Sequence, residues 1–144
     1  MNLERIRRIK RLREFELEQA QMAYAGLLNE LARLEGEIEG YLRVRAQVIG
    51  KIREIKLAQE YNGDDLRFTY GYLVYVEDVL SRLHREKEAL LERIELARRQ
   101  MLERKVEKDI TEKLESKAKL ELLSREVALE RKELEENALQ RYRK

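Results

Sequence analysis

The side chains that most often carry out chemistry in proteins are rare in this chain. It has 144 residues, no cysteine and one histidine, His84. A lone imidazole has no second nitrogen or thiolate ligand with which to share a metal, and neither a serine–histidine pairing nor a glycine-rich phosphate loop is present. We therefore expect no catalytic site, no metal and no cofactor, and we interpret the 29 Asp and Glu residues as solvated helix faces.

Basic side chains at the N-terminus form a second chemical group, one that could attract anions. Through residue 13, Glu4 is the only acid, and the cations are Arg5, Arg7, Arg8, Lys10, Arg11 and Arg13. Such a patch can attract nucleic acid, an anionic membrane or an acidic protein surface. No groove-reading module accompanies it, so we expect protein partners and no nucleic acid.

A third group consists of closely spaced aromatic residues in the middle of the chain. Its members are Tyr61, Phe68, Tyr70, Tyr72 and Tyr75. They either close a corner of the fold or form an exposed docking patch, because tyrosine provides a large contact area at little entropic cost. A corner offers little surface on which to bury so many rings, so we favour the docking patch.

A hydrophobic seam with alternating steps of three and four residues determines how these groups are positioned. Its first run is Leu17, Ala20, Tyr24, Leu27, Leu31, Leu34, Ile38, Tyr41, Arg45, Val48, Ile52 and Ile55. Its second run is Thr69, Leu73, Val76, Leu80, Leu83, Lys87, Leu90, Ile94, Ala97 and Met101. This spacing lines one side of an α-helix that packs against another helix.

The segment between the two runs predicts a corner. Asn62-Gly63 can supply a left-handed residue that ends the first helix, and Asp64 or Asp65 can cap the second. The sequence thus predicts an all-α fold, a long antiparallel two-helix coiled-coil hairpin with a longer C-terminal helix. We expect one domain over residues 1–144, with helices at about 3–60 and 66–142 and a turn at about 61–65.

Some positions depart from this plain pattern. After Met101 the seam loses its regularity, because the next apolar residues step by four: Leu102, Val106, Ile110 and Leu114. We expect the C-terminal segment to project beyond the paired region. Arg45 and Lys87 lie in the seam, where long cations can reach solvent and help to fix the register. Four glycines face away from the seam: Gly26, Gly36, Gly40 and Gly50. Either the long helix tolerates them without any structural role, or another helix approaches closely on this side.

The composition agrees with long helices, since 42% of the chain is charged and proline is absent. No stretch without charge approaches the roughly 20 residues that span a bilayer. The basic N-terminus also lacks the apolar core of a signal peptide. We therefore expect a soluble, intracellular protein.

Three segments form an ordered pattern along the chain. The first is residues 3–23, a basic start that leads into Glu16-x-x-Gln19-Ala20. The second is Tyr70-x-Tyr72-Leu73-x-Tyr75-x-x-x-Val79-Leu80, which follows the glycine-containing break. The third comprises residues 112–115 and 131–138. Together they resemble the FliJ family, the small coiled-coil component of the bacterial flagellar type III export apparatus, although Glu135-Glu136-Asn137 stands in place of the family's usual Asp-Glu pair.

This resemblance implies a non-enzymatic stalk that binds the export ATPase hexamer, promotes assembly of its ring, and links it to the export gate membrane protein and to export chaperones. The gate-binding patch would comprise Leu42, Ile49, Tyr72, Tyr75 and Val79. The end that faces the ATPase would include Arg5, Arg7, Arg8 and Arg11. The protein would be cytoplasmic and would associate peripherally with the inner face of the cell membrane, reaching it only through protein partners.

Other interpretations of the same pattern stay open. One is the stalk protein of a virulence-type secretion system, and another is a stalk subunit of a rotary ATPase. A third is a structural coiled-coil homodimer, in which the seam would pair between two chains instead of within one.

Overall fold

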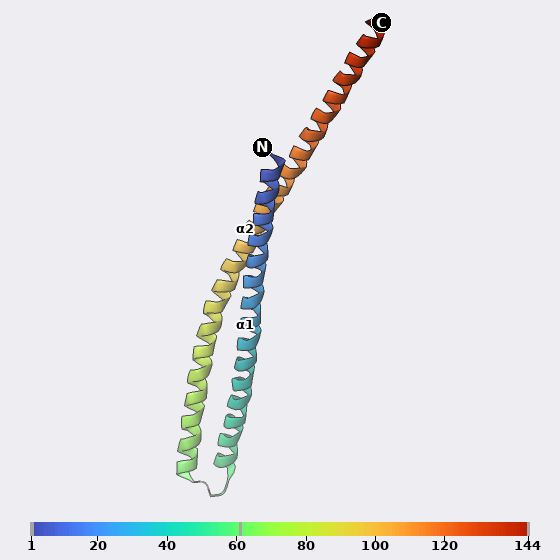
Figure 1. The fold of residues 1–144 in the computed structure, drawn as a ribbon. Coiled ribbons are helices and arrows are strands. Elements are labelled where there is room, and N and C mark those ends of the chain that lie inside the picture. The colour runs from blue at the N-terminus through green and yellow to red at the C-terminus, as the bar shows by residue number, and fades with distance from the viewer. Residues whose placement is uncertain (1, 61, 144) are drawn as a thin grey trace. The chain divides into compact units, whose positions relative to one another are not determined.

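The computed structural model describes residues 2–60 and 62–143, which form two long α-helices (Figure 1). Helix α1 spans Leu3–Leu57 and α2 spans Gly63–Arg143, so that the second helix is the longer by 26 residues (81 against 55). The helices pack together as a hairpin, and no strand occurs among the described residues. The predicted all-α hairpin with a longer second helix is confirmed. The helices end and begin about three residues earlier than the sequence predicted.

Both helices start with an asparagine cap. The Oδ1 atom of Asn2 accepts a hydrogen bond of 2.9 Å from the Glu4 backbone N–H, and Asn62 Oδ1 accepts one of 2.9 Å from the Asp64 N–H. Each bond satisfies one of the N–H groups that a helix start leaves without a partner. The prediction that Asp64 or Asp65 caps α2 is therefore wrong.

The corner also differs from the sequence prediction in its backbone. Gly63 is the first residue of α2, and no described residue has a positive φ. The expected left-handed Asn62-Gly63 pair is wrong, because the asparagine cap draws the glycine into the helix. Tyr61, which we assigned to the aromatic patch, lies outside the described residues.

The chain divides into two compact units, each built from antiparallel stretches of α1 and α2. The hairpin unit is Met22–Arg99, and the terminal unit is Met1–Gln21 together with Gln100–Lys144. The two are described separately below because each has its own kind of interior.

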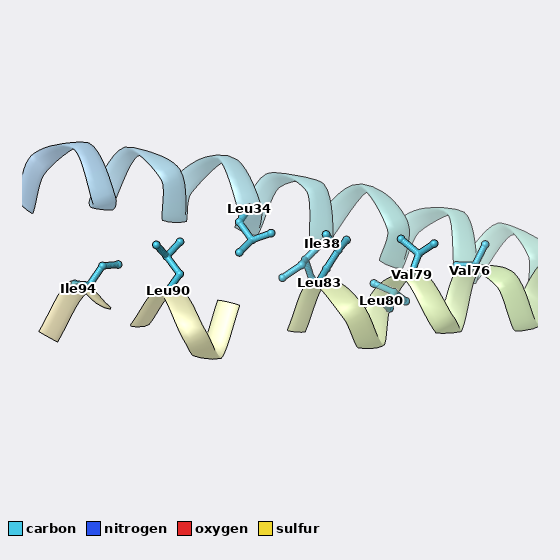
Figure 2. Packing of buried hydrophobic residues seen from close by; sticks show 8 residues of the cluster. All are labelled: Leu34, Ile38, Val76, Val79, Leu80, Leu83, Leu90 and Ile94. Carbon is cyan, nitrogen blue, oxygen red and sulfur yellow. The ribbon is translucent and has the colours of Figure 1, made fainter. Parts of the chain in front are cut away.

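A continuous apolar core fills the hairpin unit (Figure 2). Its buried members come from both helices: Leu34, Ile38, Val76, Val79, Leu80, Leu83, Leu90 and Ile94. All predicted seam positions in this unit except Arg45 are buried or half-buried, and Val76 is completely buried. The predicted seam is thus confirmed here, where each fully buried Val, Leu or Ile side chain contributes roughly 1.5–3 kcal/mol.

The two cations of this seam form ion pairs across the helices at its edge. Arg45 Nε lies 3.6 Å from Glu77 Oε1, and Lys87 Nζ lies 3.6 Å from Glu35 Oε1. All four side chains keep at least a third of their surface in solvent. Pairs this exposed contribute about 0–1 kcal/mol, so their main effect is to favour one register over others.

The terminal unit keeps the spacing of the seam but changes its chemistry. On α1 the positions that continue the steps of three and four are Leu3, Ile6, Lys10, Arg13, Leu17 and Ala20, all buried or half-buried. On α2 the corresponding positions are Met101, Arg104, Lys108, Thr111, Glu115 and Ala118, and only Arg104 among them is exposed. Half of these twelve positions are polar or charged, so ion pairs share the interior of this unit with apolar contacts.

Leu102, Val106, Ile110 and Leu114, where the sequence predicted that the seam loses its regularity, are all exposed. Steps of four exceed one turn of 3.6 residues, so these side chains drift around α2 and away from the contact with α1. From Lys119 to Arg143 every described residue is exposed, and this part of α2 runs on past the start of α1 (Figure 1). The predicted projection of the C-terminal segment is confirmed.

Candidate protein-docking surfaces

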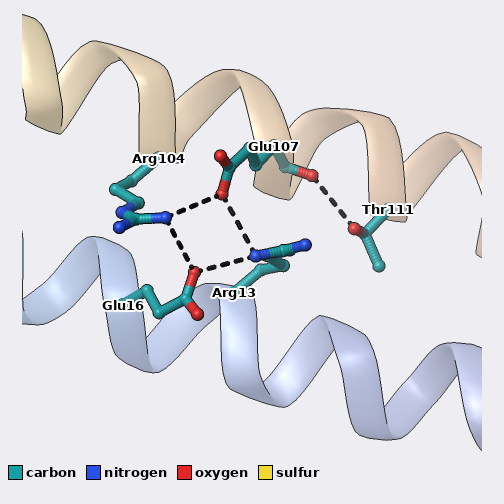
Figure 3. Close-up of polar contacts among 5 residues, drawn as sticks. All are labelled: Arg13, Glu16, Arg104, Glu107 and Thr111. Atoms are coloured by element: carbon teal, nitrogen blue, oxygen red, sulfur yellow. Dashed lines mark hydrogen bonds and ion pairs between the residues drawn. The ribbon is translucent and has the colours of Figure 1, made fainter.

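A closed group of four charges holds the helices of the terminal unit together (Figure 3). Arg13 Nη1 lies 3.0 Å from Glu16 Oε2 and 3.2 Å from Glu107 Oε2. Arg104 Nη1 lies 3.4 Å and 3.2 Å from the same two oxygens. Each cation thus bridges both carboxylates, which cancels the charge that the two helices bring together. We call this group the ionic square.

A second ionic contact joins the same helices nearer the start of α1. Lys10 Nζ and Lys119 Nζ each lie 3.3 Å from Glu115 Oε1. Burial disfavours the charged form of Glu115, but the hydrogen bonds from Lys10 and Lys119 outweigh that effect and lower the pKa of the carboxyl. Glu115 is therefore an ionised, largely buried anchor between α1 and α2.

The structure sorts the basic N-terminal residues into two sets. Lys10 and Arg13 face α2 and make the ion pairs just described. The four arginines assigned to the ATPase end are all exposed, and none of them pairs with another described residue within 4.0 Å: Arg5, Arg7, Arg8 and Arg11. These unpaired cations can attract an acidic surface over a distance comparable with the Debye length, roughly 8–10 Å at physiological salt.

An exposed aromatic surface lies on α2 of the hairpin unit. The rings of Tyr72 and Tyr75 stack with their centroids 6.2 Å apart, and the Lys56 ammonium lies 5.4 Å from the centroid of the Tyr70 ring. Phe68 is 80% exposed. Tyrosine and phenylalanine rings that remain in solvent on a rigid helix are typical anchors of protein–protein contacts.

Part of this surface forms a groove between the two helices. Its residues on α2 are Phe68, Thr69 and Tyr72, and those on α1 are Val44, Gln47, Val48 and Lys51. We call it the aromatic groove. The groove residues on α1 were not predicted from the sequence. They could have been, because in an antiparallel helix pair the residue that precedes a seam position on one helix lies beside the residue that precedes a seam position on the other. That rule places Val44 and Lys51 next to Phe68 and Tyr72.

The five residues predicted to bind the export gate do not form one patch. Val79 is only 6% exposed and belongs to the core, so its assignment to an exposed surface is wrong. Leu42 precedes Val44 by two residues and therefore lies on the opposite flank of α1, and Ile49, seven residues after Leu42, shares that flank. Of the five, only Tyr72 lines the aromatic groove, and Tyr75 stacks on it.

Elsewhere, residues 2–60 and 62–143 contain no group of three or more His, Cys, Asp or Glu side chains that could hold a metal ion. His84 is exposed. Neither α1 nor α2 includes a stretch apolar enough and long enough to cross a membrane. The chain matches no protein-family model, and no curated protein or solved structure was found that matches it.

Proposed function

We propose that this chain is a non-enzymatic component of the bacterial flagellar protein export apparatus. It acts as a stalk-like helical hairpin that binds the export ATPase, promotes assembly of its ring, and links the ring to the membrane export gate and to export chaperones. The observation that carries this proposal is the presence of two chemically different docking surfaces on a helical hairpin, one basic and one aromatic. The resemblance to the FliJ family supports it.

The basic surface is assigned to the ATPase ring. Arg5, Arg7, Arg8 and Arg11 have no acidic partner among the described residues, so their field acts on an approaching protein. Charges at the edge of an interface mainly raise the rate of association and make it sensitive to salt. The arginines therefore account for the capture of an acidic ring surface.

The aromatic surface is assigned to the export gate. Tyr72 and Tyr75 stack on one another, and Phe68 and Lys51 line the groove beside them. This arrangement suits a partner segment that inserts an apolar side chain next to a carboxylate. The cytoplasmic location and the peripheral association with the membrane follow from this assignment.

The proposal is tested by mixing the chain with the flagellar export ATPase of the same organism and following ring assembly and ATP hydrolysis together. Stimulation of both at about one chain for each six-subunit ring is expected, because a central stalk occupies the axis of a cyclic assembly once. Absence of binding at low salt, where electrostatic attraction is strongest, would reject the proposal.

Two alternatives predict different outcomes. The stalk of a virulence-type system or of a rotary ATPase would stimulate the ATPase of that system in the same assay, and not the flagellar enzyme. A structural homodimer would have twice the mass of the single chain by sedimentation equilibrium. The intrachain packing of Val76, Leu80 and Leu83 against α1 disfavours the dimer, because a seam shared between chains would need these same residues.

A further inference from the structure

Residues 119–143 of α2 form a lone helix, which we call the overhang. Every described residue of the overhang is exposed, and it runs on past the start of α1 (Figure 1). Leu120, Leu129 and Leu134 are exposed by 61–69%. Helices gain most of their stability by packing an apolar face, and a lone helix of this length is marginal in water. The overhang therefore has a surface suited to a partner that covers it.

Apolar side chains of the overhang gather on one side. Within an arc of about 100° lie six residues that line two shallow hollows along the helix: Leu120, Leu123, Val127, Leu134, Ala138 and Tyr142. We call this side the overhang face. Leu120 follows the buried Thr111 by nine residues, or two and a half turns, so the face points away from the side of α2 that contacts α1. A second helix can therefore pack on it without displacing α1.

The charges along this part of α2 are arranged in mirror order around Glu126. Three cation–anion pairs lie at equal distances on either side of it: Lys117 and Glu135 at nine residues, Lys119 and Glu133 at seven, and Glu121 and Arg131 at five. A second copy that runs antiparallel, with its Glu126 at the level of this one, brings each cation level with an anion of the other copy. Only Glu126 then meets its own kind. A parallel copy in register would set every charge against its own kind, which is unfavourable.

The same register also suits the apolar side chains. To within one residue, Val127 comes level with Ser124 of the second copy, so that a large side chain meets a small one, as knobs meet holes in paired helices. At the end of the contact, Tyr142 comes level with Ile110 of the second copy, a residue that is exposed on α2. The contact thus extends over residues 110–142, about 50 Å of helix.

We infer that the chain self-associates through the overhang, as an antiparallel dimer with a two-fold axis at the level of Glu126. Such a contact is isologous, because both copies contribute the same face. An anionic membrane is a poorer occupant, since residues 117–135 carry five cations and five anions and gain no net attraction to it. The α1–α2 packing of each copy is kept, so this dimer differs from one in which the seam pairs between chains. The inference goes beyond the proposed function and does not rest on it.

Two aspartate substitutions test the overhang face. Val127→Asp places a charge within the contact and is expected to raise the dissociation constant of the dimer on the order of tenfold or more. Leu129→Asp is the matched control, because Leu129 follows Leu120 by nine residues and lies on the opposite side of the overhang. The two variants carry the same new side chain two residues apart, so any loss of helix propensity is shared. Sedimentation equilibrium of the full chain measures both constants.

A charge reversal tests the pairing of the two copies. Lys119 already lies 3.3 Å from Glu115 within its own helix, so the exposed Lys117 is the cation to change. Lys117→Glu should weaken the dimer several-fold. Adding Glu135→Lys to the same chain should restore it, because the two-fold axis rebuilds the pair with its charges exchanged.

Spin labels determine the orientation of the copies. The natural chain has no cysteine, so single cysteines at residues 126 and 140 can each carry one nitroxide. An antiparallel dimer sets the two labels at 126 close together. Residue 140 comes level with residue 112 of the second copy, so the labels at 140 are separated by about 42 Å along the helix axis. Labels that are close at both positions indicate a parallel dimer and overturn the inference.

The remaining outcomes are equally distinct. A dimer that Val127→Asp dissociates and Leu129→Asp leaves intact supports the inference. A wild-type chain that is monomeric at millimolar concentration overturns it. A dimer that survives Val127→Asp also overturns it and assigns the association to seam pairing, and a monomer whose flotation with phosphatidylglycerol vesicles is abolished by Val127→Asp assigns the face to a membrane. The ATPase assay is independent of all these results, so the proposed function is tested separately.

Discussion

Glu95 on the surface of α2 shows how strongly neighbouring side chains can perturb a single carboxyl. Arg98 Nε and Nη2 donate hydrogen bonds of 2.9 Å and 2.7 Å to its two oxygens, and Arg99 Nε donates one of 3.3 Å. The hydrogen bonds from Arg98 are the largest cause of a pKa lowered from 4.5 to about 2. We expect Arg98→Ala to return the pKa toward 4.5, and Arg99→Ala to raise it less, in a carboxyl carbon NMR titration.

The same pair has a defined pH dependence. Because the folded pKa of Glu95 lies below the unfolded one, its contribution to stability is fully present above about pH 4.5 and is lost as the pH falls toward 2. Both partners are about 45% exposed, so solvent screening keeps this contribution small. A titration midpoint near 4.5 in the wild type would contradict the bidentate geometry.

Gly36, within α1, is a second residue-scale test. A Cβ atom built on it meets nothing within 4 Å. Alanine should therefore add only its higher helix propensity and raise the free energy of unfolding by about 0.5–1 kcal/mol, as measured by urea denaturation. If Gly36→Ala stabilises the free chain but abolishes binding of a partner, then that partner approaches the helix closely at this position.

At the scale of the helices, one chemical change can be compared in two settings. Leu83 is 3% exposed in the core of the hairpin unit, and Leu102 is exposed on the outside of the terminal unit. Leu83→Ala should lower the free energy of unfolding by about 2–5 kcal/mol, because it leaves a cavity among packed side chains. Leu102→Ala should change it by less than about 0.5 kcal/mol. Equal losses in urea denaturation would mean that Leu102 is covered in the free protein.

The ion pairs between the helices of the terminal unit make its helix pairing sensitive to acid. The pKa of Glu115 is lowered in the folded state, so its ionic contribution is present above pH 4.5 and is lost as the pH falls through the folded pKa. We expect the thermal midpoint of this unit, followed by backbone NMR of residues 3–21, to fall on acidification. Glu115→Gln should lower that midpoint at neutral pH and weaken its pH dependence. A midpoint with the same pH dependence in this variant would assign the acid sensitivity to other carboxylates.

The contacts between the helices were predicted correctly wherever a residue both kept the three-and-four spacing of the seam and was apolar. In the hairpin unit Leu34, Val76 and Leu83 satisfy both criteria, and all three are buried. After Met101 the two criteria separate, because the three-and-four spacing continues through Thr111 and Glu115 while the leucines drift away. Thr111 and Glu115 were not predicted to face α1, because they are not apolar and ion pairs replace some of the hydrophobic contacts inside the terminal unit.

The candidate sites were less predictable than the helices, for reasons that depend on the partner helix. Heptad labels place Leu42 and Tyr72 beside the seam, but an antiparallel partner puts them on opposite flanks of the pair. Val79 also lies beside the seam, and its burial follows from how closely α1 packs there. The exposure of Arg7 and Arg8, by contrast, could be predicted from the spacing alone, because the seam positions that face α2 here are 10 and 13.

For the molecule as a whole, the basic and aromatic surfaces belong to different units, so each can be disabled without the other. Tyr72→Ala combined with Tyr75→Ala should abolish binding to the export gate, because it removes the stacked rings while leaving the core of the hairpin unit intact. Leu42→Ala is the matched control on the opposite flank and should leave gate binding unchanged. Stimulation of the export ATPase should persist in both variants.

The reciprocal variant, Arg7→Glu combined with Arg8→Glu, should spare gate binding and weaken binding to the ATPase. Loss of two steering cations should also flatten the dependence of that affinity on salt, since fewer charges remain to be screened. Surface plasmon resonance against each partner at several salt concentrations measures both effects. If one variant lost both partners while circular dichroism showed full helicity, the surfaces would be coupled. The chain would then transmit binding between its partners, and a passive tether would no longer describe it.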